Sequence, residues 1–234
     1  MDDTNITEST FDDMADEYDA QLKEALGVFG GGNLDKFAKY KIDLLTKILP
    51  DFRGSLLEFG CGTGRNIPFI HAAYPEAQIF GCDISELSIE VAKKTLSVGE
   101  FTKVSTPEEL ERTYPDGIDC IFVSVVMHHI PPAEHAEYLA ALSKILKPEG
   151  LLIIFEHNPA NPVTSHIFKT NDIDKGAAML KASYLTKQLR ESGFRDVSKS
   201  YILFFLWRNK FFDFIEKGLR WLPLGAQYYT TAKK

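Results

Sequence analysis

A short apolar run that ends in three closely spaced glycines is the feature that most constrains this fold. Residues 56–64 read Leu-Leu-Glu-Phe-Gly-Cys-Gly-Thr-Gly, and a helical pattern follows over 66–73. Glycine at every second position allows a tight turn and lets a ligand approach the backbone closely. The N-terminus of the following helix favours a negatively charged group. The segment therefore predicts a strand, a ligand-binding loop and a helix in succession.

The position of Asp83 strengthens this prediction. It follows Gly64 by 19 residues and ends the next apolar run, residues 78–82. A carboxylate at the carboxyl end of such a strand lies in the crevice of a doubly wound sheet, where it can accept both hydroxyls of a ribose. A dinucleotide loop of the form G-x-G-x-x-G would need a glycine where this chain has Arg65. The pattern predicts a ribose-containing ligand and counts against a dinucleotide.

Apolar runs alternate with helical patterns along most of the chain. We expect strands at residues 55–59, 78–82, 101–104, 118–126 and 151–155. Strands that alternate with helices form βαβ units and a parallel sheet. Residues 158–181 show no clear period and are interpreted as a functional loop. A helix over 185–189 and a further strand over 197–206 are expected after it.

The composition excludes several classes of protein. The 234 residues include 26 Lys and Arg against 33 Asp and Glu, and this net charge of −7 argues against a general nucleic-acid binder. Cys61, Cys82 and Cys120 lack zinc-ligand spacing and predict buried thiols. The N-terminus is acidic and unlike a secretory signal, and no stretch of about 18 apolar residues could span a bilayer. These features predict a cytoplasmic protein without a transmembrane segment.

Three separated motifs resemble one known family. Residues 58–64, Glu-Phe-Gly-Cys-Gly-Thr-Gly, are similar to the E/D-x-G-x-G-x-G signature of class I S-adenosylmethionine-dependent methyltransferases. Residues 11–19 resemble the F-D-x-x-A-x-x-Y-D opening of small-molecule members, which include quinone-biosynthesis methyltransferases. Residues 147–152 resemble the L-K-P-G-G-x-L turn before the fifth strand of the family. The resemblance covers about residues 11–157.

This resemblance implies a fold and a division of the chain. The fold class is α/β, with a doubly wound, mostly parallel, seven-stranded Rossmann-like sheet and an antiparallel last strand, for which residues 227–231 are the candidate. A single methyltransferase domain would span residues 1–234. It would consist of a helical lid at 1–50, a cofactor-binding core at 51–157, and a substrate-side insertion with the final strands at 158–234.

The resemblance also implies S-adenosylmethionine as the cofactor and S-adenosylhomocysteine as its product. Tyr18 would close over the site, Asp83 would hold the ribose and Ile84 would cover the adenine. The implied cofactor-binding residues are Tyr18, Glu58, Gly60, Cys61, Gly62, Gly64, Asp83, Ile84, Ser124 and Val125. Many members place an Asp after the third strand to accept from the adenine amino group. This chain has Ser105-Thr106-Pro107 there, so the adenine contact is not assigned.

Methyl transfer from a sulfonium requires alignment of nucleophile, methyl carbon and sulfur, and a base where the nucleophile carries a proton. The candidate catalytic bases follow the fourth and fifth strands and are His128, His129, Glu156 and His157. The alternative is that these side chains only pack or position the substrate. No metal site is predicted, because Glu156 alone does not supply the clustered carboxylates of a metal-dependent enzyme. The remaining three histidines are expected on helix surfaces or in loops, and they are His71, His135 and His166.

Residues 199–234 concentrate aromatic and basic side chains, with ten of the 28 aromatic residues. One interpretation is packing on the sheet; the other is an apolar acceptor site or a weak contact with a membrane surface. The sequence therefore predicts methyl transfer to a small acceptor that is apolar, aromatic or lipid-like. Two alternatives stay open, a nicotinamide-dependent oxidoreductase and a methyltransferase-like module that binds the cofactor without turnover.

Overall fold

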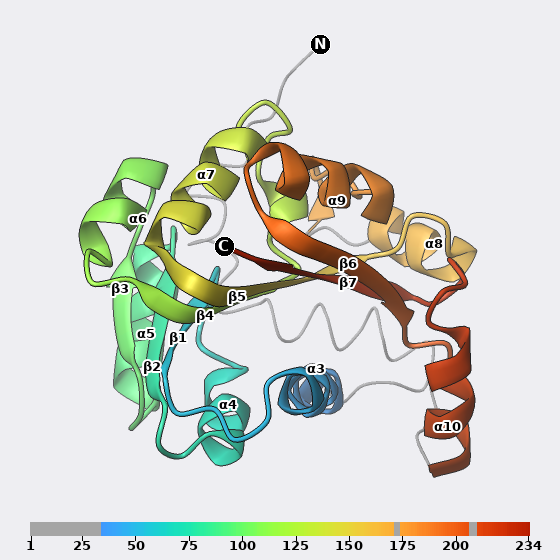
Figure 1. The fold of residues 1–234 in the computed structure, drawn as a ribbon, viewed down its shortest axis with the longest axis horizontal. Helices are drawn as coiled ribbons and strands as arrows, with labels where there is room; N and C mark the ends of the chain where they lie inside the picture. Colours follow the sequence, from blue (N-terminus) through green and yellow to red (C-terminus); the bar gives the residue numbers. More distant parts are fainter. Residues whose placement is uncertain (1–33, 171–173, 206–209) are drawn as a thin grey trace.

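Seven strands form one mixed sheet in the order β3-β2-β1-β4-β5-β7-β6 (Figure 1). The structure is a computed structural model that describes residues 34–170, 174–205 and 210–234. Its strands are β1 (Ser55–Phe59), β2 (Gln78–Asp83), β3 (Glu100–Lys103), β4 (Ile118–Ser124), β5 (Leu146–His157), β6 (Arg195–Ile202) and β7 (Gln227–Lys233). Strands β1 to β5 pair in parallel, and β7 runs antiparallel between β5 and β6. The predicted doubly wound, mostly parallel sheet with an antiparallel last strand is confirmed.

Helices cover both faces of this sheet (Figure 1). One face carries α3 (Leu34–Ile48), α4 (Ile67–Ala73) and α5 (Glu86–Thr95), and the other carries α6 (Pro107–Thr113), α7 (His135–Ile145) and α9 (Ala182–Glu191). Successive residues of a strand point to opposite faces. Leu56 of β1 therefore shares a core with Ile70 of α4, whereas Leu57 shares one with Leu142 of α7. This arrangement explains why two consecutive residues of β1, Leu56 and Leu57, are both apolar.

Capping residues visible in the sequence begin two of the helices. The Ser85 hydroxyl accepts a hydrogen bond from the Ser88 N–H at 3.0 Å at the start of α5. The Thr106 hydroxyl accepts from the Glu109 N–H at 3.2 Å at the start of α6, and the Glu109 carboxylate accepts from the Ser105 N–H at 2.8 Å. These bonds satisfy N–H groups that have no partner within the helix.

The elements differ from the expected ones in two places that matter for function. Strand β4 ends at Ser124 rather than at residue 126, because Val125 has a φ of 56°, which a β-branched residue seldom adopts. The segment 158–181, expected to be a loop, contains α8 (Pro162–Thr170). The Asn161 side chain accepts from the Thr164 N–H at 3.0 Å and starts this helix.

The predicted division of the chain into lid, core and insertion stays a prediction. Residues 1–33 of the proposed lid, with Tyr18, lie outside the described residues. The rest of that segment forms α3, whose Leu45 packs in the core with Ile70 of α4. Helix α10 (Lys210–Leu219) stands at the far end of the sheet (Figure 1). Within the described ranges, no helix is both long enough and apolar enough to cross a membrane.

Candidate functional site

The glycine loop after β1 has the backbone geometry that its sequence predicts. Gly60, Gly62 and Gly64 have φ angles of 71°, 53° and 80°, where glycine is favoured over other residues. The N–H groups of Gly60 and Cys61 both donate to the carbonyl oxygen of Cys82 in β2, at 2.8 and 2.9 Å. A Cβ atom on Gly62 would meet nothing within 4 Å. The loop is thus fixed to the sheet, and its backbone at Gly62 borders open space.

Asp83, at the end of β2, lies beside this exposed part of the loop. Its Oδ2 accepts from the Gly62 N–H at 2.7 Å, and its Oδ1 accepts from the Ser85 N–H at 3.0 Å. The next residue, Ile84, is half-buried. The structure therefore brings the predicted ribose acceptor and the glycine loop into direct contact.

Glu58 is a buried carboxyl group immediately before the loop. Its Oε1 accepts from the Asn66 side-chain amide at 2.5 Å. Its Oε2 is buried and has no hydrogen-bond partner among the residues that the structure describes. Burial raises the pKa of Glu58 to about 8, so the carboxyl group is mostly neutral at pH 7. A donor or a cation placed beside Oε2 would satisfy this group.

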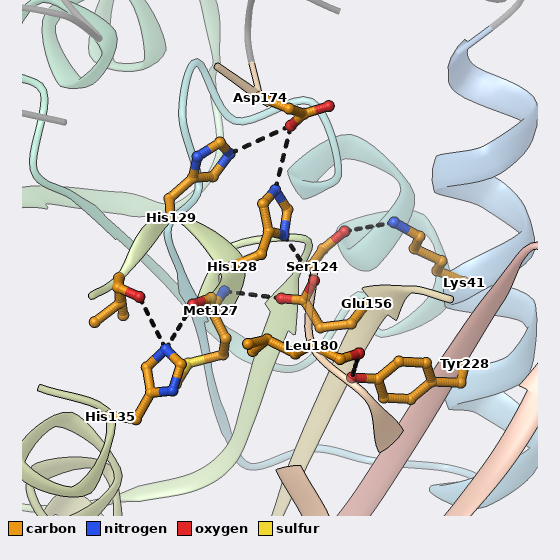
Figure 2. A network of polar contacts seen from close by, with 11 residues as sticks. Lys41, Ser124, Met127, His128, His129, His135, Glu156, Asp174, Leu180 and Tyr228 are labelled. Carbon is orange, nitrogen blue, oxygen red and sulfur yellow. Dashed lines mark hydrogen bonds and ion pairs between the residues drawn. The ribbon is translucent and has the colours of Figure 1, made fainter. Parts of the chain in front are cut away.

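Lys41 is a site residue that the sequence reasoning missed. It lies on α3, is only 5% exposed, and its Nζ donates to the Ser124 hydroxyl at the end of β4 at 2.7 Å (Figure 2). Burial lowers the pKa of Lys41 to about 8, although Glu156 and Glu58 act in the opposite direction. One signal could have identified it, since Lys41 occupies the helical position between Ala38 and Leu45, which are both core residues.

Glu156 and His128, two of the four predicted bases, are paired with each other (Figure 2). Glu156 Oε2 lies 2.7 Å from His128 Nδ1, and Glu156 Oε1 accepts from the Met127 N–H at 2.8 Å. His128 Nε2 lies 3.4 Å from Oδ1 of Asp174. Burial lowers the pKa of His128, but the two carboxylates outweigh it and raise the pKa to about 9. His128 is therefore an imidazolium at neutral pH in this arrangement.

The other two predicted bases lie beside His128. The His129 ring centroid is 4.1 Å and the His157 centroid 5.5 Å from that of His128. Burial and the neighbouring His128 lower the pKa of His129 to about 3 and that of His157 to about 4, so both are neutral at pH 7. All four predicted residues thus gather at one place. Asp174, which joins them from the loop after α8, was not predicted.

The turn that carries these histidines is anchored from below by His135. Its Nε2 lies 2.9 Å from the carbonyl oxygens of Met127 and Ile130 and must donate to them, since a carbonyl only accepts (Figure 2). His135 is fully buried, so its expected place on a helix surface is wrong. It falls on the inward face of α7 together with Leu139 and Leu142. The three predicted thiols, including Cys61 of the loop, are free and buried as expected.

Comparisons with known proteins indicate the class of this domain. Residues 57–152 match a family model described as a methyltransferase domain. Ribosomal RNA small subunit methyltransferase C of Photobacterium profundum is 39% identical over 92 residues, which cover 38% of this chain and 26% of that protein. Trans-aconitate 2-methyltransferase of Azoarcus sp. is 29% identical over 113 residues, which cover 48% of this chain and 42% of that protein. The chain thus spans less than half the length of these two curated relatives.

The fold has solved counterparts as well. The crystal structure of a SAM dependent methyltransferase from Archaeoglobus fulgidus superposes with a TM-score of 0.63 and 21% identity, over 84% of this chain and 94% of that one. The family match identifies a methyltransferase domain over residues 57–152, and the solved structure shares the fold. Both support the predicted resemblance to the class I S-adenosylmethionine-dependent methyltransferases.

The residues present fit the cofactor of that class. Its ribose hydroxyls need an acceptor, which Asp83 offers at the mouth of the glycine loop. Its methionine part carries an ammonium group, and the buried Oε2 of Glu58 lacks a partner among the described residues. Gly62 leaves the space into which a bound group can extend. Ser105-Thr106-Pro107, where many members have an acidic residue, caps α6 through Thr106.

Proposed function

We propose that this protein transfers the methyl group of S-adenosylmethionine to a small-molecule acceptor held over the carboxyl ends of β4 and β5. One observation carries the proposal. Strands β1 and β4 are neighbours at the point where the strand order reverses, so the glycine loop and the histidine turn open onto the same edge of the sheet. In open α/β sheets, ligands bind outside this edge at such a switch point.

Different groups of the chain would bind different parts of the cofactor. S-adenosylmethionine supplies an electrophilic methyl group on a sulfonium centre when it is bound. The glycine loop allows close approach, Asp83 accepts from the ribose hydroxyls, and Glu58 Oε2 accepts from the ammonium group. Ser124 ends β4 next to this site, and the strained φ of Val125, which follows it, turns the chain away from the sheet.

Among the four predicted bases, His157 fits proton removal best. Glu156 is occupied by the Met127 N–H and by His128, and His128 is protonated at neutral pH. His129 is neutral, but its Nε2 is directed toward Asp174. His157 is neutral at pH 7 and half-buried at the end of β5, so its imidazole retains a lone pair. A neutral imidazole can take a proton from an acceptor hydroxyl or amine as the methyl group is transferred. The alternative is that these residues only position the acceptor. It predicts that the rate of methyl transfer is unchanged when His157 is replaced.

We infer an acceptor with an apolar, aromatic or lipid-like body and a polar end. Phe168 of α8 packs edge-on against the rings of His128 and His157 at 5.5 and 5.9 Å and supplies an apolar wall. Lys41 supplies a buried cation beside Ser124 for the polar end. The net charge of −7 favours a small molecule over a nucleic acid as the partner. The three free cysteines support a reducing, cytoplasmic setting.

The C-terminal segment supports a weak contact of the protein with a membrane surface, where a lipid-like acceptor would be bound. Phe211 and Phe214 of α10 are 66% and 77% exposed, and Trp221 after the helix is 75% exposed. Phe211 and Phe214 therefore lie on the surface and not in an acceptor pocket, contrary to the expectation that this segment lines one. Lys217 on the same helix is exposed and adds positive charge.

Two measurements test the proposed function. Calorimetry should show that S-adenosylhomocysteine binds to the full chain, whereas NAD does not bind. Release of S-adenosylhomocysteine should then be followed with a panel of aromatic, prenylated and lipid-linked acceptors, with ribosomal RNA as the contrasting acceptor. Binding of NAD alone, or product release only with RNA, would overturn the proposal.

A further inference from the structure

Two histidines and a carboxylate converge above the sheet, outside the glycine loop. His128 and His129 belong to the short turn η1 (Met127–His129) after β4, and Asp174 comes from the loop between α8 and α9. One ligand atom from each of the three lies within 4.8 Å of the others. Figure 2 shows both rings directed toward the Asp174 carboxylate. All three side chains are at least largely buried, with exposed fractions of 2%, 13% and 8%.

We propose that His128, His129 and Asp174 bind one divalent transition-metal ion. Asp174 Oδ1 lies 3.4 Å from His128 Nε2 and 3.8 Å from His129 Nε2. Charge-assisted hydrogen bonds between such groups are shorter, about 2.7–2.9 Å. Ligand atoms around a tetrahedral ion with bonds of about 2.0–2.1 Å lie about 3.4 Å apart. These two separations are therefore closer to the edges of a coordination tetrahedron than to hydrogen bonds, and the two histidine ligand atoms lie within 4.8 Å of each other.

The residues behind the cluster orient His128 as metal sites require. Glu156 accepts from His128 Nδ1 at 2.7 Å, which places the ring proton there and leaves Nε2 to face Asp174. Glu156 is itself held by the Met127 N–H at 2.8 Å. A carboxylate that fixes the tautomer of a ligating histidine is a recurrent support of metal sites. The carbonyl oxygen of His128 also accepts from the Ala178 N–H at 3.1 Å, which ties the Asp174 loop to the turn.

The donor set indicates the class of metal. Two imidazole nitrogens and one carboxylate oxygen suit Zn²⁺, Co²⁺ or Fe²⁺, whereas Ca²⁺ and Mg²⁺ prefer oxygen ligands throughout. Three protein ligands leave at least one coordination position for water or for an oxygen of a bound molecule. Binding at this place would displace the proton that His128 otherwise carries between its two carboxylates. The site uses none of the residues assigned to the cofactor.

Metal titration of the full chain tests this proposal without any methyl donor, so its outcome is independent of the proposed function. The chain is stripped with a chelator and titrated with ZnCl₂ by calorimetry, and with CoCl₂ by visible absorption. We expect one equivalent of each metal and the intense visible bands of four-coordinate Co²⁺. His129→Gln and Asp174→Asn should each weaken Zn²⁺ binding at least 100-fold. His71→Gln, on α4 across the sheet, is the matched control and should bind as the wild type does.

Unfolding temperatures separate loss of the site from loss of the fold. Saturating Zn²⁺ should raise the unfolding temperature of the wild type and of His71→Gln, because a ligand that binds only the folded state stabilises it. The same Zn²⁺ concentration should leave His129→Gln and Asp174→Asn unchanged. Absence of stoichiometric Zn²⁺ and Co²⁺ binding by the wild type would overturn the proposal. So would wild-type affinity in both variants.

Discussion

The ammonium nitrogen of Lys41 on α3 lies 2.7 Å from the hydroxyl oxygen of Ser124 at the end of β4, and it is surrounded by protein. A lysine that gives up its hydration in this way favours its neutral form, which is why its pKa falls to about 8. Glu58 and Glu156 offset the loss only in part. Burial of Lys41 therefore lowers the stability of the folded state, and it places a positive charge at the centre of the candidate site.

Replacement of Lys41 by Met should stabilise the protein at neutral pH. Below pH 8, Lys41 is protonated in both the folded and the unfolded state, so the whole burial cost is present. Between pH 8 and the ordinary lysine pKa of 10.5, the folded state releases its proton first and the cost declines. The variant should exceed the wild type by up to about 3 kcal/mol at pH 7, and the gap should narrow by pH 10. Urea unfolding of both proteins at pH 7 and pH 10 measures this difference in the free energy of unfolding.

Lys39→Met is the control on the same helix. The Lys39 side chain is 62% exposed and pairs with Asp43, so its removal should change the free energy of unfolding by less than about 1 kcal/mol. A stability gap for Lys41→Met that is the same at pH 7 and pH 10 would contradict the assignment of a lowered pKa to Lys41.

Cofactor binding should depend on Gly62 and Asp83. A side chain at Gly62 meets no protein atom but enters the space left for the cofactor, so Gly62→Val should abolish binding of S-adenosylhomocysteine in calorimetry. Asp83→Ala should weaken it by about 1.5–3 kcal/mol, as expected when a charged acceptor is lost. Gly193→Val is a matched control, because Gly193 also has a positive φ and no neighbour within 4 Å.

Both glycine variants should lose a similar amount of stability, about 1–2 kcal/mol, from the strained backbone. Only Gly62→Val should lose the cofactor. Tight binding by Gly62→Val, or equal weakening in Gly193→Val, would show that the loop is not the cofactor site.

The fold and the cofactor loop could be predicted from the sequence because they depend on local patterns. Strand β1 carries Leu56, Leu57 and Phe59, and the glycines that follow it are two residues apart. Ser85 and Thr106 cap later helices. Each of these signals lies within a few residues of the element that it specifies. The end of β4 was predicted two residues too late, because nothing in the sequence around Ser124 indicates that Val125 leaves the strand.

The polar part of the site could be predicted only in part, since it depends on contacts between distant segments. His128 and Glu156 were predicted because parallel strands end at the same edge of a sheet. Asp174 is one of two acidic residues, with Asp172, in a segment without periodicity, and only the packing of its loop brings it to His128. Lys41 did leave a signal, because a lysine at a core position of an amphipathic helix needs a partner.

Cofactor binding should release a proton from Glu58. Its pKa of about 8 keeps the carboxyl group protonated at pH 7, and an ammonium group at Oε2 would favour the ionised form. Calorimetry at pH 7 in buffers of different ionisation enthalpy should therefore show net proton release with the wild type. Glu58→Gln keeps the shape of the side chain and should show none. Identical binding enthalpies in all buffers with the wild type would count against this contact.

If His157 is the base, His157→Ala should lower turnover by about 10²–10⁴ while binding of S-adenosylhomocysteine is nearly unchanged. The imidazole is the one group at the end of β5 that is neutral and half-buried, so nothing nearby replaces it. His166→Ala is the control, because His166 on α8 is exposed. If the turnover of His157→Ala is within a factor of three of the wild type, His157 is not the base, and catalysis rests on alignment of the acceptor alone.

The exposed aromatic residues of α10 should determine attachment to lipid surfaces. Glu216, on the inner side of the helix, accepts hydrogen bonds from the Tyr40 hydroxyl and the Phe204 N–H, so α10 is fixed with Phe211 and Phe214 facing outward. The double variant Phe211→Ser, Phe214→Ser should bind anionic vesicles at least about tenfold more weakly in a sedimentation assay, because two apolar side chains no longer enter the interface. Val163→Ser removes an exposed apolar residue of α8 and should bind as the wild type does. Vesicle binding that is equal in all three proteins would remove the membrane surface from the proposed function, and the aromatic residues of α10 would then have to be explained by a contact with another protein.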